Sequence, residues 1–222
     1  MKRKPIVGMS LKTYINKIDE SLAIPTKMIE KFKNTKDIDL FLLPSIGTLY
    51  PVAKVLEKTN IGYGAQNIGP ELKGPFTGEL SLESVIDLGG KYVELGHAER
   101  KRIFKEDYEL INKKIILTLD HSLIPIICIG ESDRSMDIRK ELEKQITSLL
   151  KDVDLTKLEN VIFAYEPEWA IGKEKSADAK YVHHAFKIIR EILEKYYGKD
   201  VSKKIRIIYG GSVSKENAKD LA

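Results

Sequence analysis

Short apolar runs recur along the 222-residue chain, separated by longer stretches rich in charge. The runs are nearly continuous rather than alternating, which is typical of parallel strands buried on both faces. Between them, apolar residues return every three or four positions, as in amphipathic helices. The predicted strands are 5–9, 38–44, 61–66, 91–96, 124–130, 161–166 and 205–210. The predicted helices are about 17–34, 47–58, 81–89, 106–120, 137–151, 180–197 and 214–221.

This alternation of strands and helices shows no break in composition, so it predicts one parallel α/β domain over residues 1–222. Such a domain is either an open doubly wound sheet or a closed barrel. The nucleotide signatures of the open form are missing, because "GYGAQN" has Asn67 in place of the third glycine and no Walker lysine follows a glycine loop. We therefore favour a (β/α)8 barrel, with its eighth βα unit missing from this chain.

Charge and cysteine content narrow the class of protein. The chain carries 37 basic and 33 acidic residues, spread without a block of one sign, for a net charge of +4. This weak bias argues little for nucleic acid and suits a small anionic ligand equally well. The one cysteine, Cys128, excludes an internal disulfide and fits the reducing cytoplasm. Because no apolar segment reaches 18 residues, we expect no membrane partner.

The chemistry of a parallel barrel collects at the carboxyl ends of its strands. Each polar residue found there would alone be read as ordinary surface, a helix cap or a turn. Their joint placement favours a site, since a base, an electrophile, a cation and a glycine-rich loop follow different strands. These residues are Ser10 and Lys12 after the first predicted strand, His97 and Glu99 after the fourth, Glu166 after the sixth, and Gly210, Gly211 and Ser212 after the seventh.

These residue types suit proton transfer next to a carbonyl group. A carboxylate such as Glu166 can remove a proton from carbon, while His97, at a helix start, polarises the carbonyl as a neutral imidazole. Lys12 can balance charge on a phosphate and on an enediolate, and the backbone of "GGS" can bind an anion. We expect no metal or cofactor, because His183 and His184 are adjacent and point roughly 100° apart on a helix.

Four segments together resemble the triosephosphate isomerase family. "VELGHAERK" is similar to the family's histidine segment, "AYEPEWAIG" to its glutamate and lid segment, and "IIYGGSV" to its phosphate loop. "GAQNIGPELKGPFTGELS" resembles the long third loop through which the family dimerises. The resemblance covers the whole chain and implies a TIM barrel, a cytoplasmic homodimer and an enzyme of glycolysis and gluconeogenesis. It also implies interconversion of dihydroxyacetone phosphate and glyceraldehyde 3-phosphate.

The resemblance assigns roles residue by residue. Glu166 becomes the base, His97 the electrophile and Lys12 the electrostatic clamp. Gly172 and Ser212 bind phosphate, with Ser10 also in the substrate site. Glu99 is implied as a supporting acid, and Thr77 as a contact to the partner subunit.

The chain departs from the family pattern at Ser10, where the family has asparagine, and in the lid, where "GKEKSA" replaces a glycine-rich continuation. Two alternatives follow. A shorter side chain at Ser10 leaves room for a four-carbon ketose phosphate such as an erythrulose phosphate. The missing eighth unit allows a non-catalytic barrel fragment that binds phosphate or a partner.

Overall fold

The computed structural model describes residues 3–172 and 177–221. Its chain forms two compact units, each made of two stretches of sequence. The first comprises Met1–Leu95 and Leu117–Pro125, and the second comprises Gly96–Ile116 and Ile126–Ala222. Among the described residues, no helix combines the length and apolarity needed to cross a bilayer.

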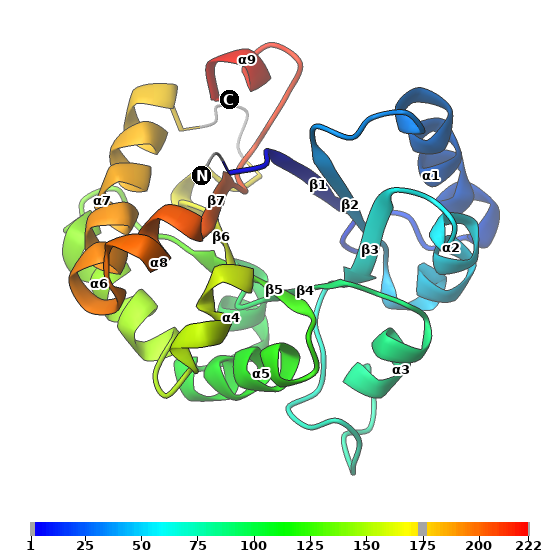
Figure 1. Ribbon diagram of the computed structural model, residues 1–222, viewed down its shortest axis with the longest axis horizontal. Helices are drawn as coiled ribbons and strands as arrows, with labels where there is room; N and C mark the ends of the chain where they lie inside the picture. Colours follow the sequence, from blue (N-terminus) through cyan, green and yellow to red (C-terminus); the bar gives the residue numbers. More distant parts are fainter. Residues whose placement is uncertain (1–2, 173–176, 222) are drawn as a thin grey trace. The chain divides into compact units, whose positions relative to one another are not determined.

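The first unit holds four parallel strands in chain order, with α1 and α2 lying side by side along them (Figure 1). Strands β1 and β2 pair with Gly8 opposite Phe41, and β2 and β3 with Phe41 opposite Gly62. The strands are β1 (Ile6–Ser10), β2 (Asp39–Leu43), β3 (Ile61–Ala65) and β4 (Tyr92–Leu95). The helices are α1 (Ile18–Phe32), η1 (Ile46–Thr48), α2 (Leu49–Leu56) and α3 (Leu82–Asp87).

Large and small side chains alternate between neighbouring strands of this sheet. The rings of Phe41 on β2 and Tyr92 on β4 lie 4.9 Å apart between centroids. A Cβ atom at Gly8 would fall 1.9 Å from the Phe41 ring, and one at Gly62 would fall 2.4 Å from the Tyr92 ring. The glycines of β1 and β3 therefore make room for the aromatic rings that fill this part of the core.

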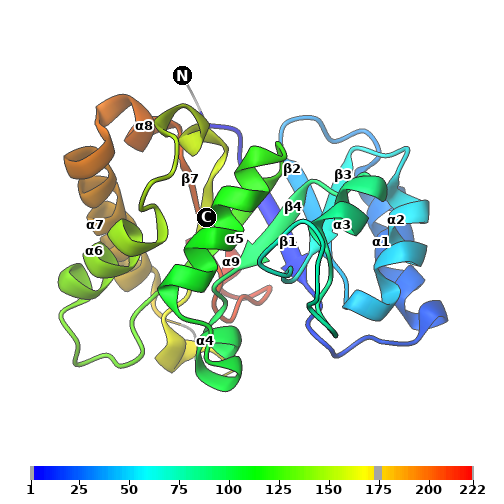
Figure 2. The same cartoon turned by 90° about the horizontal axis from the view of Figure 1, so that it is seen from below.

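The second unit holds three further parallel strands in chain order, with helices packed against one another around them. Helices α6 and α7 run side by side here (Figure 2). Helix α7 also packs on β6 and α8. The strands are β5 (Ile124–Ile129), whose first two residues count with the first unit, β6 (Ile162–Tyr165) and β7 (Arg206–Tyr209). The helices are α4 (Ala98–Phe104), α5 (Tyr108–Asp120), whose last four residues count with the first unit, α6 (Ile138–Leu149), η2 (Leu155–Asn160), η3 (Glu168–Ala170), α7 (Ala179–Tyr197), α8 (Lys199–Lys204) and α9 (Ala218–Leu221).

The predicted strands are confirmed to within one residue at each end, and the long helices to within two. The start of α4 at His97 was expected but its extent was not, and α8 was not predicted, because six or seven residues give too few turns for a clear periodic pattern. Helix α9 begins four residues later than expected. The cause is a local turn, in which the Ser214 backbone N–H donates to the Asn217 side chain at 2.8 Å.

Candidate active site

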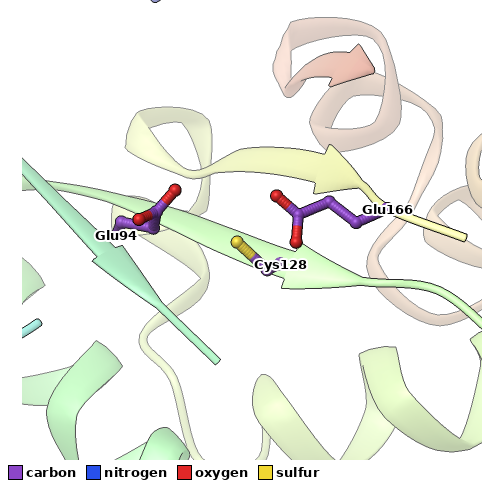
Figure 3. Close-up of side chains that lie close together, drawn as sticks. All are labelled: Glu94, Cys128 and Glu166. Atoms are coloured by element: carbon purple, nitrogen blue, oxygen red, sulfur yellow. The ribbon is translucent and has the colours of Figure 1, made fainter. Parts of the chain in front are cut away.

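Glu166 follows β6 directly and remains tied to the sheet. Its backbone N–H donates to the Ile129 carbonyl at 2.7 Å, and the residue as a whole is only 5% exposed. Two glycines make room for it, since a Cβ at Gly210 would lie 2.5 Å from Glu166 Oε1 and one at Gly130 would lie 2.0 Å from the Glu166 carbonyl oxygen. Figure 3 shows the carboxylate beside Cys128 of β5, which is buried as expected for a structural thiol.

His97 caps the start of α4, and its backbone geometry fixes the tautomer of its ring. Nδ1 accepts a hydrogen bond from the Glu99 backbone N–H at 3.1 Å. A neutral imidazole must therefore carry its proton on Nε2. Nε2 lies 3.7 Å from Glu166 Oε2, within the same unit of the structure, and the His97 side chain is 9% exposed.

This pair offers a proton donor and a carboxylate side by side in a site largely removed from solvent. The separation of 3.7 Å is too long for a direct hydrogen bond but suits two groups that act on adjacent atoms of one small molecule. The backbone N–H of Glu99 holds Nδ1 in this arrangement, and the Glu99 carboxylate lies nearby, with Oε2 at 3.7 Å from the same nitrogen.

The end of β7 and the loop after it contact the segment after β6 at two points. The Ser212 hydroxyl donates to the Ala170 carbonyl at 3.3 Å, and the Ala177 backbone N–H donates to the Tyr209 hydroxyl at 3.3 Å. Burial raises the pKa of Tyr209, so this hydroxyl stays protonated at neutral pH. Gly172 is exposed, with a left-handed φ of 68°. The departure of the lid from the family pattern, over residues 173–176, lies outside the described residues.

Ser10 and Lys12 belong to the first unit, where Ser10 is the last residue of β1 and Lys12 follows two residues later. The Ser10 hydroxyl donates to Glu94 Oε2 at 2.9 Å. Because β1 and β4 are not neighbours, this bond spans the face of the sheet. Lys12 has a left-handed φ of 48°, which is strained for a residue with a side chain, and its carbonyl accepts from Gln66 at 3.0 Å. Thr77 is exposed on the long loop after β3.

The sequence interpretation missed Glu131, a buried acid that immediately follows β5 and Gly130. Its carboxylate accepts hydrogen bonds from the Tyr165 hydroxyl at 3.0 Å, the Trp169 indole N–H at 2.7 Å and the Tyr181 hydroxyl at 2.8 Å. Burial and this carboxylate raise the pKa of Tyr181 to about 12. The signal was present in the sequence, since Glu131 follows its apolar strand much as Glu166 follows its own.

Comparison with known proteins gives a consistent result. The family model described as triosephosphate isomerase matches residues 5–222. A protein of Listeria monocytogenes (strain F2365) named "Probable triosephosphate isomerase 2" is 47% identical, over 99% of this chain and 87% of that protein. The "Triosephosphate isomerase" of Carboxydothermus hydrogenoformans is 40% identical over 99% of this chain and 88% of that protein. The "Triosephosphate isomerase" of Thermoanaerobacter sp. (strain X514) is 38% identical over 99% of this chain and 89% of that protein.

Proposed function

Because the chain belongs to the triosephosphate isomerase family, we propose that it interconverts dihydroxyacetone phosphate and glyceraldehyde 3-phosphate. Family membership also confirms the predicted fold class, an α/β TIM barrel, and seven of its strands lie in the described residues. The observation that carries the proposal is the pairing of His97 Nε2 with Glu166 at 3.7 Å, with the imidazole proton directed to that side.

In the forward direction, Glu166 takes a proton from carbon 1 of the ketose, and the C–H electron pair forms the enediolate double bond. The carbonyl oxygen on carbon 2 receives the hydrogen bond of His97 Nε2–H as it gains negative charge. His97 passes a proton to the oxygen on carbon 2 and takes one from the hydroxyl on carbon 1, and Glu166 returns a proton to carbon 2, which leaves an aldehyde at carbon 1 and a hydroxyl at carbon 2. A glutamate base beside a neutral histidine is the established arrangement of this same enzyme family.

The remaining site residues bind the substrate in this proposal. Lys12 balances the negative charge of the phosphate and of the enediolate, with Ser10 nearby in sequence on the same strand end. Gly172 and Ser212 donate to the phosphate from the two segments that already meet at Ala170. Glu99 acts as a supporting acid near the site, and its backbone N–H keeps the His97 ring in place.

We further propose a homodimer in the cytoplasm. Thr77 is exposed on the loop expected to enter the partner subunit, and Tyr14 and Ile46 of the first unit are 83% and 59% exposed. Large exposed apolar side chains are what a partner would cover. Sedimentation of the wild type and of Thr77→Arg tests this, with a dimer expected for the first and a weakened dimer for the second. A monomeric wild type would contradict it.

The function is tested by coupled assays of the purified chain with dihydroxyacetone phosphate, glyceraldehyde 3-phosphate and an erythrulose phosphate. We expect turnover of the two triose phosphates, with the larger kcat/KM for these substrates. A clear preference for the four-carbon compound would shift the assignment to the tetrulose isomerase that Ser10 suggests. Phosphate binding without turnover of any of the three would support the non-catalytic alternative.

A further inference from the structure

An ion pair links the segment that carries the proposed base to the helix that begins at the proposed electrophile. Lys101 Nζ lies 3.1 Å from Glu168 Oε1, with side chains that are 16% and 21% exposed. Glu168 stands two residues after Glu166, at the start of η3, and Lys101 stands four residues after His97, on α4. Because both side chains are largely shielded, solvent and salt screen this pair less than an exposed one.

Backbone hydrogen bonds and chain connectivity link each of the two charged residues to the site. The Lys101 backbone N–H donates to the His97 carbonyl at 3.2 Å, so Lys101 lies one helical turn from the ring. On the other side, Pro167 separates Glu166 from Glu168 and has no backbone N–H to anchor it. Glu168 is thus the first residue after the base whose backbone N–H can form a hydrogen bond, and this N–H donates to the Glu131 carbonyl at 2.9 Å.

We propose that Lys101 and Glu168 are positioning residues, whose ion pair holds the His97 and Glu166 side chains at their working separation. The inference rests on the proposed function. Neither residue acts on the substrate itself. Proton transfer depends steeply on geometry, and a misplacement of about 1 Å can cost about 100-fold in rate, so a partial loosening should lower turnover without abolishing it.

A double-mutant cycle tests the pair, with Lys101→Met, Glu168→Gln and both together. We expect each single variant to lower kcat about two- to tenfold and to change KM by less than about twofold. The double variant should be no slower than the slower single variant, because both remove the same interaction. Lys101→Arg, which keeps the charge, should restore most of the rate.

Lys204→Met is the matched control. It breaks the ion pair between Lys204 and Glu159 of the same unit, which spans 2.8 Å but is 54% and 50% exposed. We expect kcat to stay unchanged in this variant. Glu168→Gln keeps the shape of its side chain, so it tests the pair even if Lys101→Met fails to fold.

Trp169 provides a second readout that needs no substrate, since it is the chain's one tryptophan and is adjacent to Glu168. We expect Lys101→Met and Glu168→Gln to change its emission and its quenching by acrylamide, and Lys204→Met to leave both unchanged. Single variants that keep wild-type kcat and fluorescence, or effects that simply add in the double variant, would overturn the inference. If the wild type turned over no sugar phosphate, the proposed function would fail, while the fluorescence cycle would still decide whether the two charges position this segment.

Discussion

Two buried carboxylates of the second unit, Glu106 and Glu131, are held in opposite ways. Glu106 is 6% exposed, and its Oε1 accepts from Arg100 Nη2 at 2.7 Å and from Lys114 Nζ at 2.6 Å. Glu131 is fully buried and accepts from neutral donors, the two tyrosine hydroxyls and the indole N–H described above. One acid is neutralised by cations, and the other is solvated by aromatic side chains.

The two clusters have different roles, since the one around Glu106 serves stability and the one around Glu131 serves function. The cations around Glu106 belong to α4 and α5, so this cluster fastens two helices together. The donors around Glu131 include Trp169, which lies three residues after Glu166, and Tyr181 near the start of α7. The two rings pack edge to face at 5.5 Å, and the Arg134 guanidinium lies 5.2 Å from the Trp169 ring. Glu131 therefore anchors the segment that carries the proposed base.

The largest expected effect on stability comes from Glu106→Gln. The substitution removes the charge that compensates Arg100 and Lys114 in a buried place, so the free energy of unfolding should fall by about 3–5 kcal/mol. Urea denaturation measures this loss. Glu159→Gln, in the exposed pair with Lys204, is the control and should cost less than about 1 kcal/mol. The kcat of the folded fraction should stay unchanged, and a large drop in kcat would contradict this separation of stability from function.

Glu131→Gln should affect activity more than Glu106→Gln does, and stability less. The amide keeps one acceptor oxygen but replaces the other with a donor, which cannot accept from the aromatic groups, so we expect a loss of about 1–3 kcal/mol in stability. Because Trp169 loses part of its anchor, kcat should fall several-fold in the folded protein. Tyr181→Phe removes one donor while leaving the carboxylate and should have a smaller effect on both. An unchanged kcat in Glu131→Gln would show that Glu131 does not contribute to activity.

The pH dependence of the free energy of unfolding should reflect the lowered pKa of Glu106. Burial alone would raise the pKa of this carboxyl, but hydrogen bonds and charge from Arg100 and Lys114 outweigh burial and hold the pKa below 4.5. A lowered pKa in the folded state stabilises the fold above the unfolded-state pKa, and this contribution is lost as pH falls through the folded-state value. As pH is lowered from about 6 to about 2.5, the urea midpoint of the wild type should therefore fall more steeply than that of Glu106→Gln. Parallel curves would contradict the assignment.

The fold was largely predictable from the sequence, and the parts that were not share a physical reason. Near-continuous apolar runs mark buried parallel strands, so β1 to β7 could be found to within one residue. The fold class followed from the alternation of strands and helices, and the family match confirms it. Helices α4 and α8 are too short to show a clear period, so the extent of α4 and the whole of α8 were not predicted.

The candidate site was predictable where a residue follows a strand, and not where its role depends on a side-chain contact. Glu166 stands directly after β6 and His97 two residues after the end of β4, and the structure brings their side chains to 3.7 Å. Lys101 is one of 37 basic residues, and nothing in its sequence context indicates that it meets Glu168. The bond between Ser10 and Glu94 likewise joins residues 84 positions apart.

The central claim is that Glu166 transfers a carbon-bound proton. It is tested most directly by following glyceraldehyde 3-phosphate conversion in D2O by NMR, with the wild type and Glu166→Asp compared. Shortening the side chain by one methylene withdraws the carboxylate from the carbon, so kcat should fall about 100-fold or more, with a much smaller change in KM. The wild-type product should carry solvent deuterium on carbon 1. Wild-type kcat in Glu166→Asp, or product free of solvent deuterium in both proteins, would contradict the account.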